Sequence, residues 1–524
     1  NISQPPFPRQ MPKDSLPMRP PSLLLALLFA GASVSAQTLI KDIRSASTND
    51  GSNPGRSVTM GNKHYFAAQV RETTGRELYV TDGTTAGTGL VKDIRGGRSG
   101  SSPLHLTVFK NALYFSAIGS GGRELWTSDG TGAGTVRVAD INPGGPGSSP
   151  ANLTVVGSNL LYFTAITAAA GRELWKTDGT EKGTVLLKDI YGGKVGSEPA
   201  SLIAFGATLI FRATTAAAGT ELWECGPLGG AGASVVKDIN PGTGSSDMDF
   251  PVLFNGSVWF QATSTANGAE LWKTNATAAG TVLVKDLKTG SMGSSPQNLT
   301  VVGNKILFTA DVTGGRELWA TDGTATGTKL VKDIQPGATG SSPAEFKVFG
   351  PSVFFTAQTV AGRELWRSDG STAGTILIRD INAGAPGSMP KELFPFGKSL
   401  YFTAITAATG RELWKTDGTS SGTVLVADII KGSGSSAAKN LGSGGSKVIF
   451  NATTLAYGSE LWATDGTATG TALLKDISGP MNHSRPKGFV SLGDLSLFVA
   501  DDGKSGIELW KTDGTAKGTS LVKD

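Results

Sequence analysis

Short apolar runs alternate with glycine-rich polar stretches along nearly the whole chain. In the stretch 296–334, apolar residues gather at 299–302 and again at 306–310, and a Gly-Asn pair separates the two runs. A third run, 316–321, changes character from one residue to the next. Because successive side chains of a strand point to opposite faces, each of these runs predicts a short β-strand.

The third run has two distinct faces and ends in a tight turn. Glu317, Trp319 and Thr321 would lie on one face of the strand, with Leu318 and Ala320 on the other. The Asp-Gly-Thr sequence that follows is typical of a hairpin turn, because glycine accepts a positive φ and aspartate bonds nearby backbone amides.

A unit of four strands then repeats along the chain. Residues 328–334 predict the fourth strand, and the stretch 336–343 connects it to the next unit. The Glu-Leu-Trp sequence of the third strand, Glu-Leu-Tyr in its earliest copy, recurs at intervals of 47–49 residues. The ten copies begin at Glu77, Glu124, Glu173, Glu221, Glu270, Glu317, Glu364, Glu412, Glu460 and Glu508. This regular spacing predicts one continuous array with no linker between two halves.

Every unit keeps the same few residues. A Phe-x-Ala sequence in the second strand and the Glu of the third occur in all ten units, and the Asp of the fourth strand occurs eleven times, from Asp42 to Asp524. The Phe and Trp side chains suit the packing of one sheet on the next. We expect the Glu and Asp to hold the units together by hydrogen bonds, because a ligand-binding residue need appear only once.

Four strands in about 48 residues match the size of a propeller blade. We therefore predict an all-β fold, a β-propeller of about ten four-stranded blades in a single continuous array. A β-sandwich has no reason to repeat its sequence and a β-helix coil is shorter, whereas a flat solenoid of sheets stays open. Antiparallel order would place the Asp-Gly-Thr turns on one rim and the connectors between units on the opposite rim.

At these residues the chain resembles the ELWxxDGT repeat proteins, a bacterial family described largely in myxobacteria. The stretches 173–180 and 412–419 both contain the full pattern, and the likeness extends over residues 38–524. The resemblance implies export and a repeat fold, and it implies no biochemical activity. The units at Trp223 and Trp272 depart from the DGT part of the pattern.

The start of the chain differs from the repeats. Arg19 precedes ten apolar residues at 23–32, and a Val-Ser-Ala sequence that ends at Ala36 suits cleavage there. This order is typical of a secretory signal peptide, and ten residues are too few to span the ~30 Å apolar core of a membrane. We expect 1–36 to be an N-terminal extension with a signal peptide and 37–524 to be the repeat domain. The protein would then be secreted or in the cell envelope, with no membrane span.

Composition narrows the range of partners and cofactors. The formal net charge is +4 and no basic run occurs, so nucleic acid is not an expected partner. The single cysteine, Cys225, cannot form an intramolecular disulfide. His64, His105 and His483 lie far apart, and no Cys or His residues have the spacing of zinc ligands. We expect no metal site and no cofactor.

The leading hypothesis is a secreted non-catalytic β-propeller that acts as a binding or scaffold protein, with a protein or glycan ligand at a rim or in the central tunnel. Nearly all carboxylates sit at repeat positions, and no catalytic motif stands out. His105 and Arg212 depart from the repeat, and we interpret both as surface or strand variation. The sequence thus predicts no catalytic or cofactor-binding residue. The alternative is a propeller-type enzyme, such as a glycosidase or lyase acting on extracellular polysaccharide.

Two questions stay open at this point. The oxygen-rich Asp-Gly-Thr turns could bind calcium, but each offers one carboxylate, and the units with Cys225 and Asn275 lack it. The second question is whether the array closes into a ring. Residues 38–43 resemble a fourth strand with no unit before it, while the last unit already has a fourth strand at 521–524. Either one strand is spare or the chain is a fragment, and ten blades exceed the usual four to eight.

Overall fold

The structure is a computed structural model, and it describes residues 52–70, 73–226, 232–479 and 481–523. Within these residues the chain forms forty strands and no helix, arranged as ten four-stranded antiparallel sheets. The described part of the chain therefore contains no helix that could cross a membrane. The predicted signal peptide and the strand-like stretch 38–43 lie outside the described residues.

Each sheet is one blade, and its strands follow one another in sequence order. The blades are numbered 1 to 10 in chain order. The first strands are β1 (Val58–Met60), β5 (Leu104–Phe109), β9 (Ala151–Val156), β13 (Ala200–Phe205), β17 (Asp249–Phe254), β21 (Gln297–Val302), β25 (Ala344–Phe349), β29 (Lys391–Phe396), β33 (Lys439–Gly444) and β37 (Lys487–Leu492). The second strands are β2 (Lys63–Val70), β6 (Ala112–Gly119), β10 (Leu160–Thr167), β14 (Thr208–Thr215), β18 (Ser257–Ser264), β22 (Lys305–Val312), β26 (Ser352–Thr359), β30 (Ser399–Thr406), β34 (Lys447–Thr454) and β38 (Leu495–Asp501).

The outer half of each blade consists of its third and fourth strands. The third strands are β3 (Gly75–Thr81), β7 (Gly122–Ser128), β11 (Gly171–Thr177), β15 (Gly219–Cys225), β19 (Gly268–Thr274), β23 (Gly315–Thr321), β27 (Gly362–Ser368), β31 (Gly410–Thr416), β35 (Gly458–Thr464) and β39 (Ile507–Thr512). The fourth strands are β4 (Gly89–Lys92), β8 (Val136–Arg137), β12 (Val185–Lys188), β16 (Ala233–Lys237), β20 (Val282–Lys285), β24 (Lys329–Lys332), β28 (Ile376–Arg379), β32 (Val424–Ala427), β36 (Ala472–Lys475) and β40 (Ser520–Lys523).

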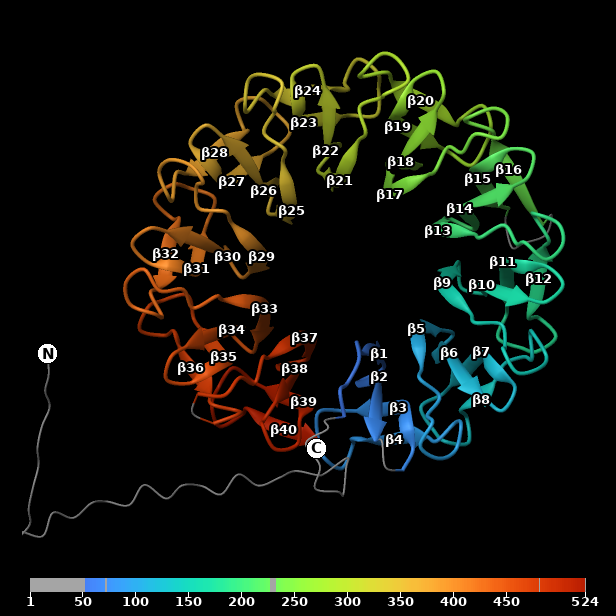
Figure 1. The fold of residues 1–524 in the computed structure, drawn as a ribbon, viewed down its shortest axis with the longest axis horizontal. Coiled ribbons are helices and arrows are strands. Elements are labelled where there is room, and N and C mark those ends of the chain that lie inside the picture. Colours follow the sequence, from blue (N-terminus) through green and yellow to red (C-terminus); the bar gives the residue numbers. More distant parts are fainter. Residues whose placement is uncertain (1–51, 71–72, 227–231, 480, 524) are drawn as a thin grey trace, which may run out of the picture. The chain divides into compact units, whose positions relative to one another are not determined.

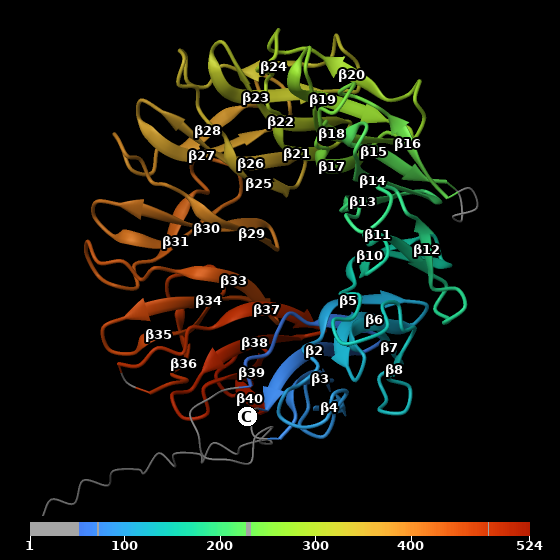
Figure 2. The same cartoon turned by 45° about the vertical axis from the view of Figure 1, so that its right-hand side comes forward.

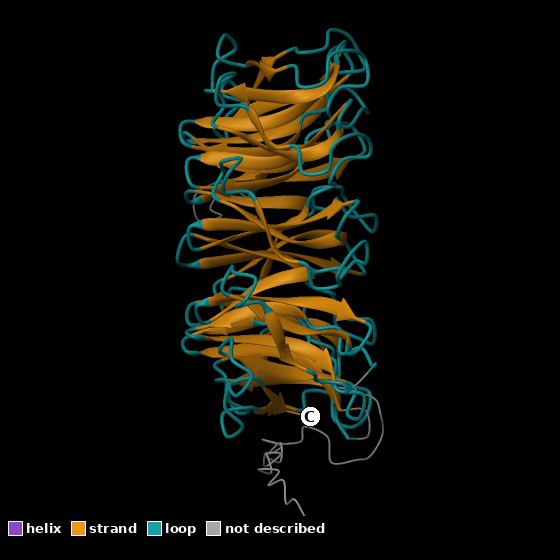
Figure 3. Ribbon diagram, turned by 90° about the vertical axis from the view of Figure 1, so that its left-hand side faces the viewer, coloured by secondary structure: helices purple, strands orange, loops and turns teal. Residues whose placement is uncertain are grey.

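The blades stand side by side around a ring, with their first strands innermost and their fourth strands outermost (Figure 1). The same succession of blades can be followed when the ring is turned (Figure 2). Seen from the edge, the strands run across the thickness of the ring and the loops lie on its two sides (Figure 3). The described chain is thus a ten-bladed β-propeller, as the repeat predicts.

Apolar side chains of adjacent blades interdigitate to form the core. Phe355, Ala357 and Trp366 of blade 7 pack in one cluster with Leu307 and Leu318 of blade 6. The Phe-x-Ala sequence and the Trp of one blade therefore cover the preceding blade, while the Leu of Glu-Leu-Trp faces the following one. The second-strand Phe is essentially inaccessible in every blade, and burying such a ring contributes about 1.5–3 kcal/mol.

Blade 10 closes the ring against blade 1. Ser52 donates its backbone N–H and its hydroxyl to the carboxylate of Glu508. Lys511 Nζ donates to the carbonyl oxygen of Gly83 (2.6 Å). The two blades also share one apolar core, which contains Phe66, Ala68, Val70, Tyr79, Leu497, Leu509 and Val522. Closure therefore uses the same kinds of contact as the other blade junctions.

Two details of the predicted unit change in the structure. The fourth strand is shorter than predicted: β24 ends at Lys332, so the Asp that follows the strand in each unit belongs to the connector. There it bonds the turn, as Asp93 does by accepting from the N–H of Gly96 (2.8 Å). Strand order confirms the predicted sides of the ring, with the Asp-Gly-Thr turns on one side, here the turn side, and the connectors on the other, here the connector side.

Candidate functional site

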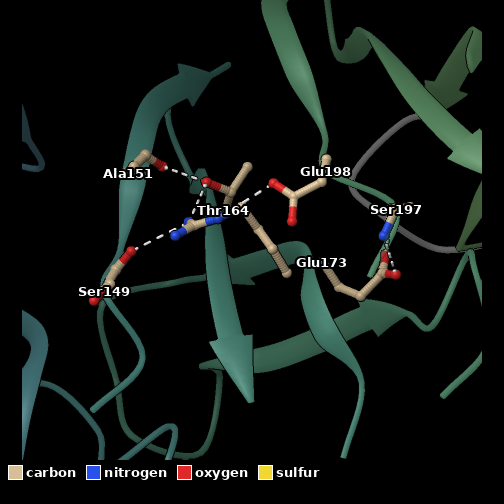
Figure 4. Close-up of polar contacts among 7 residues, drawn as sticks. Ser149, Ala151, Thr164, Glu173, Ser197 and Glu198 are labelled. Atoms are coloured by element: carbon tan, nitrogen blue, oxygen red, sulfur yellow. Dashed lines mark hydrogen bonds and ion pairs between the residues drawn. The ribbon is translucent and has the colours of Figure 1, made fainter. Parts of the chain in front are cut away.

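The glutamate kept in every third strand is buried and binds the chain segment that leads into the next blade around the ring. In blade 3, the Glu173 carboxylate accepts from the backbone N–H (2.7 Å) and the hydroxyl (2.5 Å) of Ser197 (Figure 4). We name this pair of bonds the Glu–Ser clasp. It recurs as Glu77–Ser101, Glu124–Ser148, Glu270–Ser294, Glu317–Ser341, Glu364–Ser388, Glu412–Ser436, Glu460–Ser484 and Glu508–Ser52. The predicted structural role of the glutamate is confirmed.

Blade 4 has an incomplete clasp. The hydroxyl of Ser246 donates to the carbonyl oxygen of Thr220 (3.3 Å), and Glu221 Oε1 has no hydrogen-bond partner, although Glu221 Oε2 accepts from the N–H of Ile239 (2.8 Å). Burial raises the pKa of Glu173, and the Ser197 hydroxyl opposes that shift. In blade 4, burial raises the pKa of Glu221 to about 7, and the nearby Asp238 adds to that rise.

In six blades, an arginine directly before the clasp glutamate lies on the connector side. In blade 3, Arg172 Nη1 donates to the carbonyl oxygen of Ser149 (3.3 Å) and to Thr164 Oγ1 (3.3 Å), near the contact of Thr164 with Ala151 (Figure 4). Arg172 Nε also lies 3.6 Å from the carboxylate of Glu198. The equivalent residues are Arg76, Arg123, Arg316, Arg363 and Arg411.

The Asp-Gly-Thr turns use their polar groups within the turn. Asp322 Oδ1 accepts from the N–H (2.9 Å) and the hydroxyl (2.8 Å) of Thr324, and these bonds hold the pKa of Asp322 below its usual range. In blade 5, Asn275 Oδ1 accepts the same two bonds from Thr277. The hairpin interpretation is confirmed, since a carbonyl oxygen replaces the carboxylate without changing the turn. Nowhere in the described part of the chain do three His, Cys, Asp or Glu side chains gather as a metal site requires.

One position of the repeat has a strained backbone and carries a different kind of side chain in different blades. The second residue of each first strand from blade 2 to blade 9 is left-handed, with φ between 52° and 60°. It belongs to a β-bulge, so that two residues of the first strand oppose one of the second. We name these residues the bulge ring: His105, Asn152, Ser201, Phe250, Asn298, Glu345, Glu392 and Asn440.

The bulge ring lies on the innermost strands, next to the connector side, because each first strand begins where a connector ends. Its members are exposed or half-buried, and Phe250 retains 49% of its accessible surface. Asn tolerates a left-handed backbone, but His, Phe and Glu do so at a cost of roughly 1–2 kcal/mol. Sequence reasoning missed this position. Variability does not single this position out, because the residue before it varies as much, from Leu104 to Asp249 and Lys391.

The off-pattern residues have separate roles. Arg212 replaces the usual Thr of the second strand in blade 4 and pairs with Asp249 of blade 5 (3.2 Å), so it supplies the guanidinium that Thr220 does not. His64 is buried in β2, where burial lowers its pKa. His105 belongs to the bulge ring. His483 lies in the connector between blades 9 and 10, so the three histidines belong to different parts of the ring.

A polar pocket of about 390 Å³ lies where blade 9 departs from the repeat. We name it the blade-9 pocket. Its lining combines amide, hydroxyl and imidazole groups with cationic side chains, from Lys439, Asn440, Asn451, Thr453, Ser459, His483, Arg485 and Lys487. A more apolar pocket of about 550 Å³ lies nearby at the junction of blades 10 and 1.

Comparison with known proteins assigns no function to the chain. No family model matches the chain, and no curated protein does. Among solved structures, the chain is similar to a puromycin hydrolase mutant at 15% identity, with 67% of this chain and 58% of that one covered and a TM-score of 0.30. It is similar to a structure from a study of two prolyl endopeptidases at 12% identity, with coverage of 68% and 54% and a TM-score of 0.36. For oligopeptidase B from Leishmania major the values are 11%, 68%, 53% and 0.34.

The chain spans between half and three fifths of the length of these three structures. Identity and TM-scores this low assign no activity to it. The fold and its strained inner positions define a ten-bladed propeller with a variable inner edge on its connector side.

Proposed function

We propose that the protein is a secreted, non-catalytic binding protein whose ligand docks on the bulge ring, on the connector side of the propeller. The likeness to the ELWxxDGT repeat proteins and the predicted signal peptide support export. The observation that carries the binding role is the left-handed backbone at His105, Phe250 and Glu345. Glycine or asparagine would relieve that strain, and side chains held at such a cost cluster at binding sites.

The rest of each blade supports a role without catalysis. Most repeated carboxylates are engaged: all of the repeated glutamates except Glu221 form complete clasps, and the turn aspartates bond within their own turns. Exposed bulge residues instead offer a mixture of amides, carboxylates, an imidazole and an aromatic ring. Such a mixture suits a ligand rich in hydroxyl groups, since amides and carboxylates bond hydroxyls and an aromatic face packs on apolar ring edges.

The test replaces three bulge residues together: His105→Gly, Phe250→Gly and Glu345→Gly. The variant should lose binding to an array of extracellular polysaccharides while its melting temperature stays equal or rises, because glycine removes backbone strain. A control with Lys182→Ala, Lys329→Ala and Lys517→Ala changes exposed residues on the turn side and should bind normally. Unchanged binding by the glycine variant would refute the proposal.

Two further measurements address export and catalysis. A chain that starts at Met11, expressed in a bacterial host, should appear outside the cytoplasm with Gln37 as its first residue, and retention in the cytoplasm would contradict export. Polysaccharides that bind should keep their length after long incubation. Shortened products would support the alternative, a propeller-type glycosidase or lyase.

A further inference from the structure

Blade 9 is one of four blades without the arginine that lies on the connector side of the other six. Ser459 occupies the position of Arg172, since both follow a glycine and precede Glu-Leu-Trp. Its hydroxyl donates to Asn451 Oδ1 (2.8 Å), and Asn451 stands where blade 3 has Thr164. A short side chain thus replaces a long one, and the blade-9 pocket of about 390 Å³ occupies this region.

Blades 4, 5 and 10 also lack the arginine and carry Thr220, Ala269 and Ile507 at this position. In blade 4, Arg212 supplies a guanidinium from the second strand instead and pairs with Asp249. In blade 9 the second-strand residue is the neutral Asn451, whose Nδ2 donates to the carbonyl oxygen of Pro486 (3.4 Å).

Cationic side chains line the rim of the blade-9 pocket, whereas in blade 3 the side chain of an arginine occupies the same region. Lys439 pairs with Asn451 in the register where blade 3 has Ala151, and Lys487 begins its first strand where blade 4 has Ala200. Arg485 stands where blade 3 has the acidic Glu198, 25 residues after the clasp glutamate. All three cationic side chains are exposed, and no described residue that lines the pocket is acidic.

The inner lining is neutral and rich in hydrogen-bonding groups. Asn451 and Ser459 are buried, and Asn440 is a member of the bulge ring. His483 Nδ1 accepts from the backbone N–H of Ser459 (2.9 Å), so the neutral imidazole carries its hydrogen on Nε2 as a further donor. Two carboxylates lie next to lining residues: Glu392 of blade 8 accepts from the N–H of Asn440 (2.9 Å), and the buried Glu460, which follows Ser459, is engaged in its clasp with Ser484.

We propose that the blade-9 pocket binds an acidic sugar residue of a polysaccharide, with its carboxylate or sulfate held by Lys439, Arg485 and Lys487 and its hydroxyls by the neutral lining. Exposed cations around buried amide and hydroxyl groups match a ligand with one anionic group and several hydroxyls. Charge-assisted bonds from Lys and Arg to an oxyanion are about twice as strong as neutral ones. The inference deepens the proposed function and rests on it, because Asn440 joins the pocket to the bulge ring.

The experiment measures binding of polygalacturonate, dextran sulfate and neutral dextran to the whole protein by biolayer interferometry at low and moderate salt. The protein should bind one or both acidic polymers and not dextran, and the two acidic polymers distinguish carboxylate from sulfate. Failure to bind either acidic polymer, or equal binding of dextran, would overturn the inference. Preference for a phosphoserine peptide over both polymers would also overturn it.

Two variants separate a defined pocket from general attraction of polyanions. The first variant combines Lys439→Ala, Arg485→Ser and Lys487→Ala, which restore residues that other blades carry at these positions, so the fold should persist. Binding should weaken about tenfold for each cation removed. Ser459→Arg should refill the pocket as Arg172 does in blade 3 and abolish binding although it adds a positive charge. Stronger binding by Ser459→Arg would show that charge alone is responsible.

Controls distinguish failure of this inference from failure of the proposed function. The turn-side variant with Lys182→Ala, Lys329→Ala and Lys517→Ala removes the same charge and should bind normally. If the pocket variants bind normally while the glycine variant of the bulge ring does not, the pocket inference fails and the proposed function stands. If both bind normally, both fail.

Discussion

Glu221 offers a pH-dependent test of how buried glutamates hold the ring. Its carboxyl is buried and has an incomplete clasp, and burial raises its pKa to about 7 from the usual 4.5. A folded pKa above the unfolded value means that the contribution to stability is full below about pH 4.5 and is lost as the pH rises through about 7. Each pKa unit corresponds to 1.36 kcal/mol, so ionised Glu221 costs about 3 kcal/mol above pH 7.

Glu221→Gln removes that cost and keeps an acceptor for the N–H of Ile239. We expect a gain of about 1–3 kcal/mol at pH 8 and almost none at pH 5, where the native carboxyl is already protonated. Because a ring of this size unfolds with a large entropy change, the gain should raise the melting temperature by about 1–4 °C at pH 8. Differential scanning fluorimetry at both pH values measures it.

Glu173→Gln is the matched control, because Glu173 has a complete clasp. Its amide would direct an N–H towards the donors of Ser197, and leaving such a buried group unpaired costs about 1–3 kcal/mol. The control should therefore melt lower than the native protein at both pH values. If Glu221→Gln also melts lower at pH 8, the incomplete clasp does not weaken blade 4 and the reasoning is wrong.

Three further predictions concern the blade junctions and turns. Gly171→Ala should destabilise the protein strongly, because φ is +66° and a Cβ would lie 2.4 Å from the backbone nitrogen of Gly196. The control Gly157→Ala, with φ +62° and open space around it, should cost about 1 kcal/mol. Equal losses of stability in urea unfolding would contradict the close approach at Gly171. Lys285→Ala should cost about 1 kcal/mol of stability by removing the bond from Lys285 Nζ to the carbonyl oxygen of Thr328 (2.8 Å). Ala427→Lys should stabilise the protein by adding the equivalent bond in blade 8. If neither variant changes the stability, the cation at the end of the fourth strand does not hold adjacent blades together. EDTA should leave the melting temperature unchanged, because Asp322 already bonds within its turn; a clear decrease would revive calcium binding.

Most of the fold could be predicted from the repeat in the sequence. The spacing of Glu-Leu-Trp predicted ten four-stranded blades, and Phe355 and Trp366 occupy the predicted places between sheets. Closure could not be predicted, because it depends on Ser52 and Glu508, which are 456 residues apart and look like ordinary members of the repeat. The length of the fourth strand was also wrong, since the Asp after it bonds a turn more readily than it continues a ladder.

The candidate site was harder to predict than the fold. The bulge depends on φ, and nothing in residues as different as Phe250 and Glu345 indicates a shared left-handed backbone. The blade-9 pocket depends on Ser459 in place of an arginine, together with cationic side chains from one connector and from the first strands of two blades. Single-residue patterns do not show such a combination, whereas superposing the blades does.

Cryo-electron microscopy of residues 37–524 mixed with polygalacturonate tests the central claim most directly. We predict a closed ring of ten blades with additional density on the connector side, over the first strands and extending to the blade-9 pocket. Density on the turn side, or an open arc of blades with density elsewhere, would contradict the assignment of binding to the inner connector-side positions.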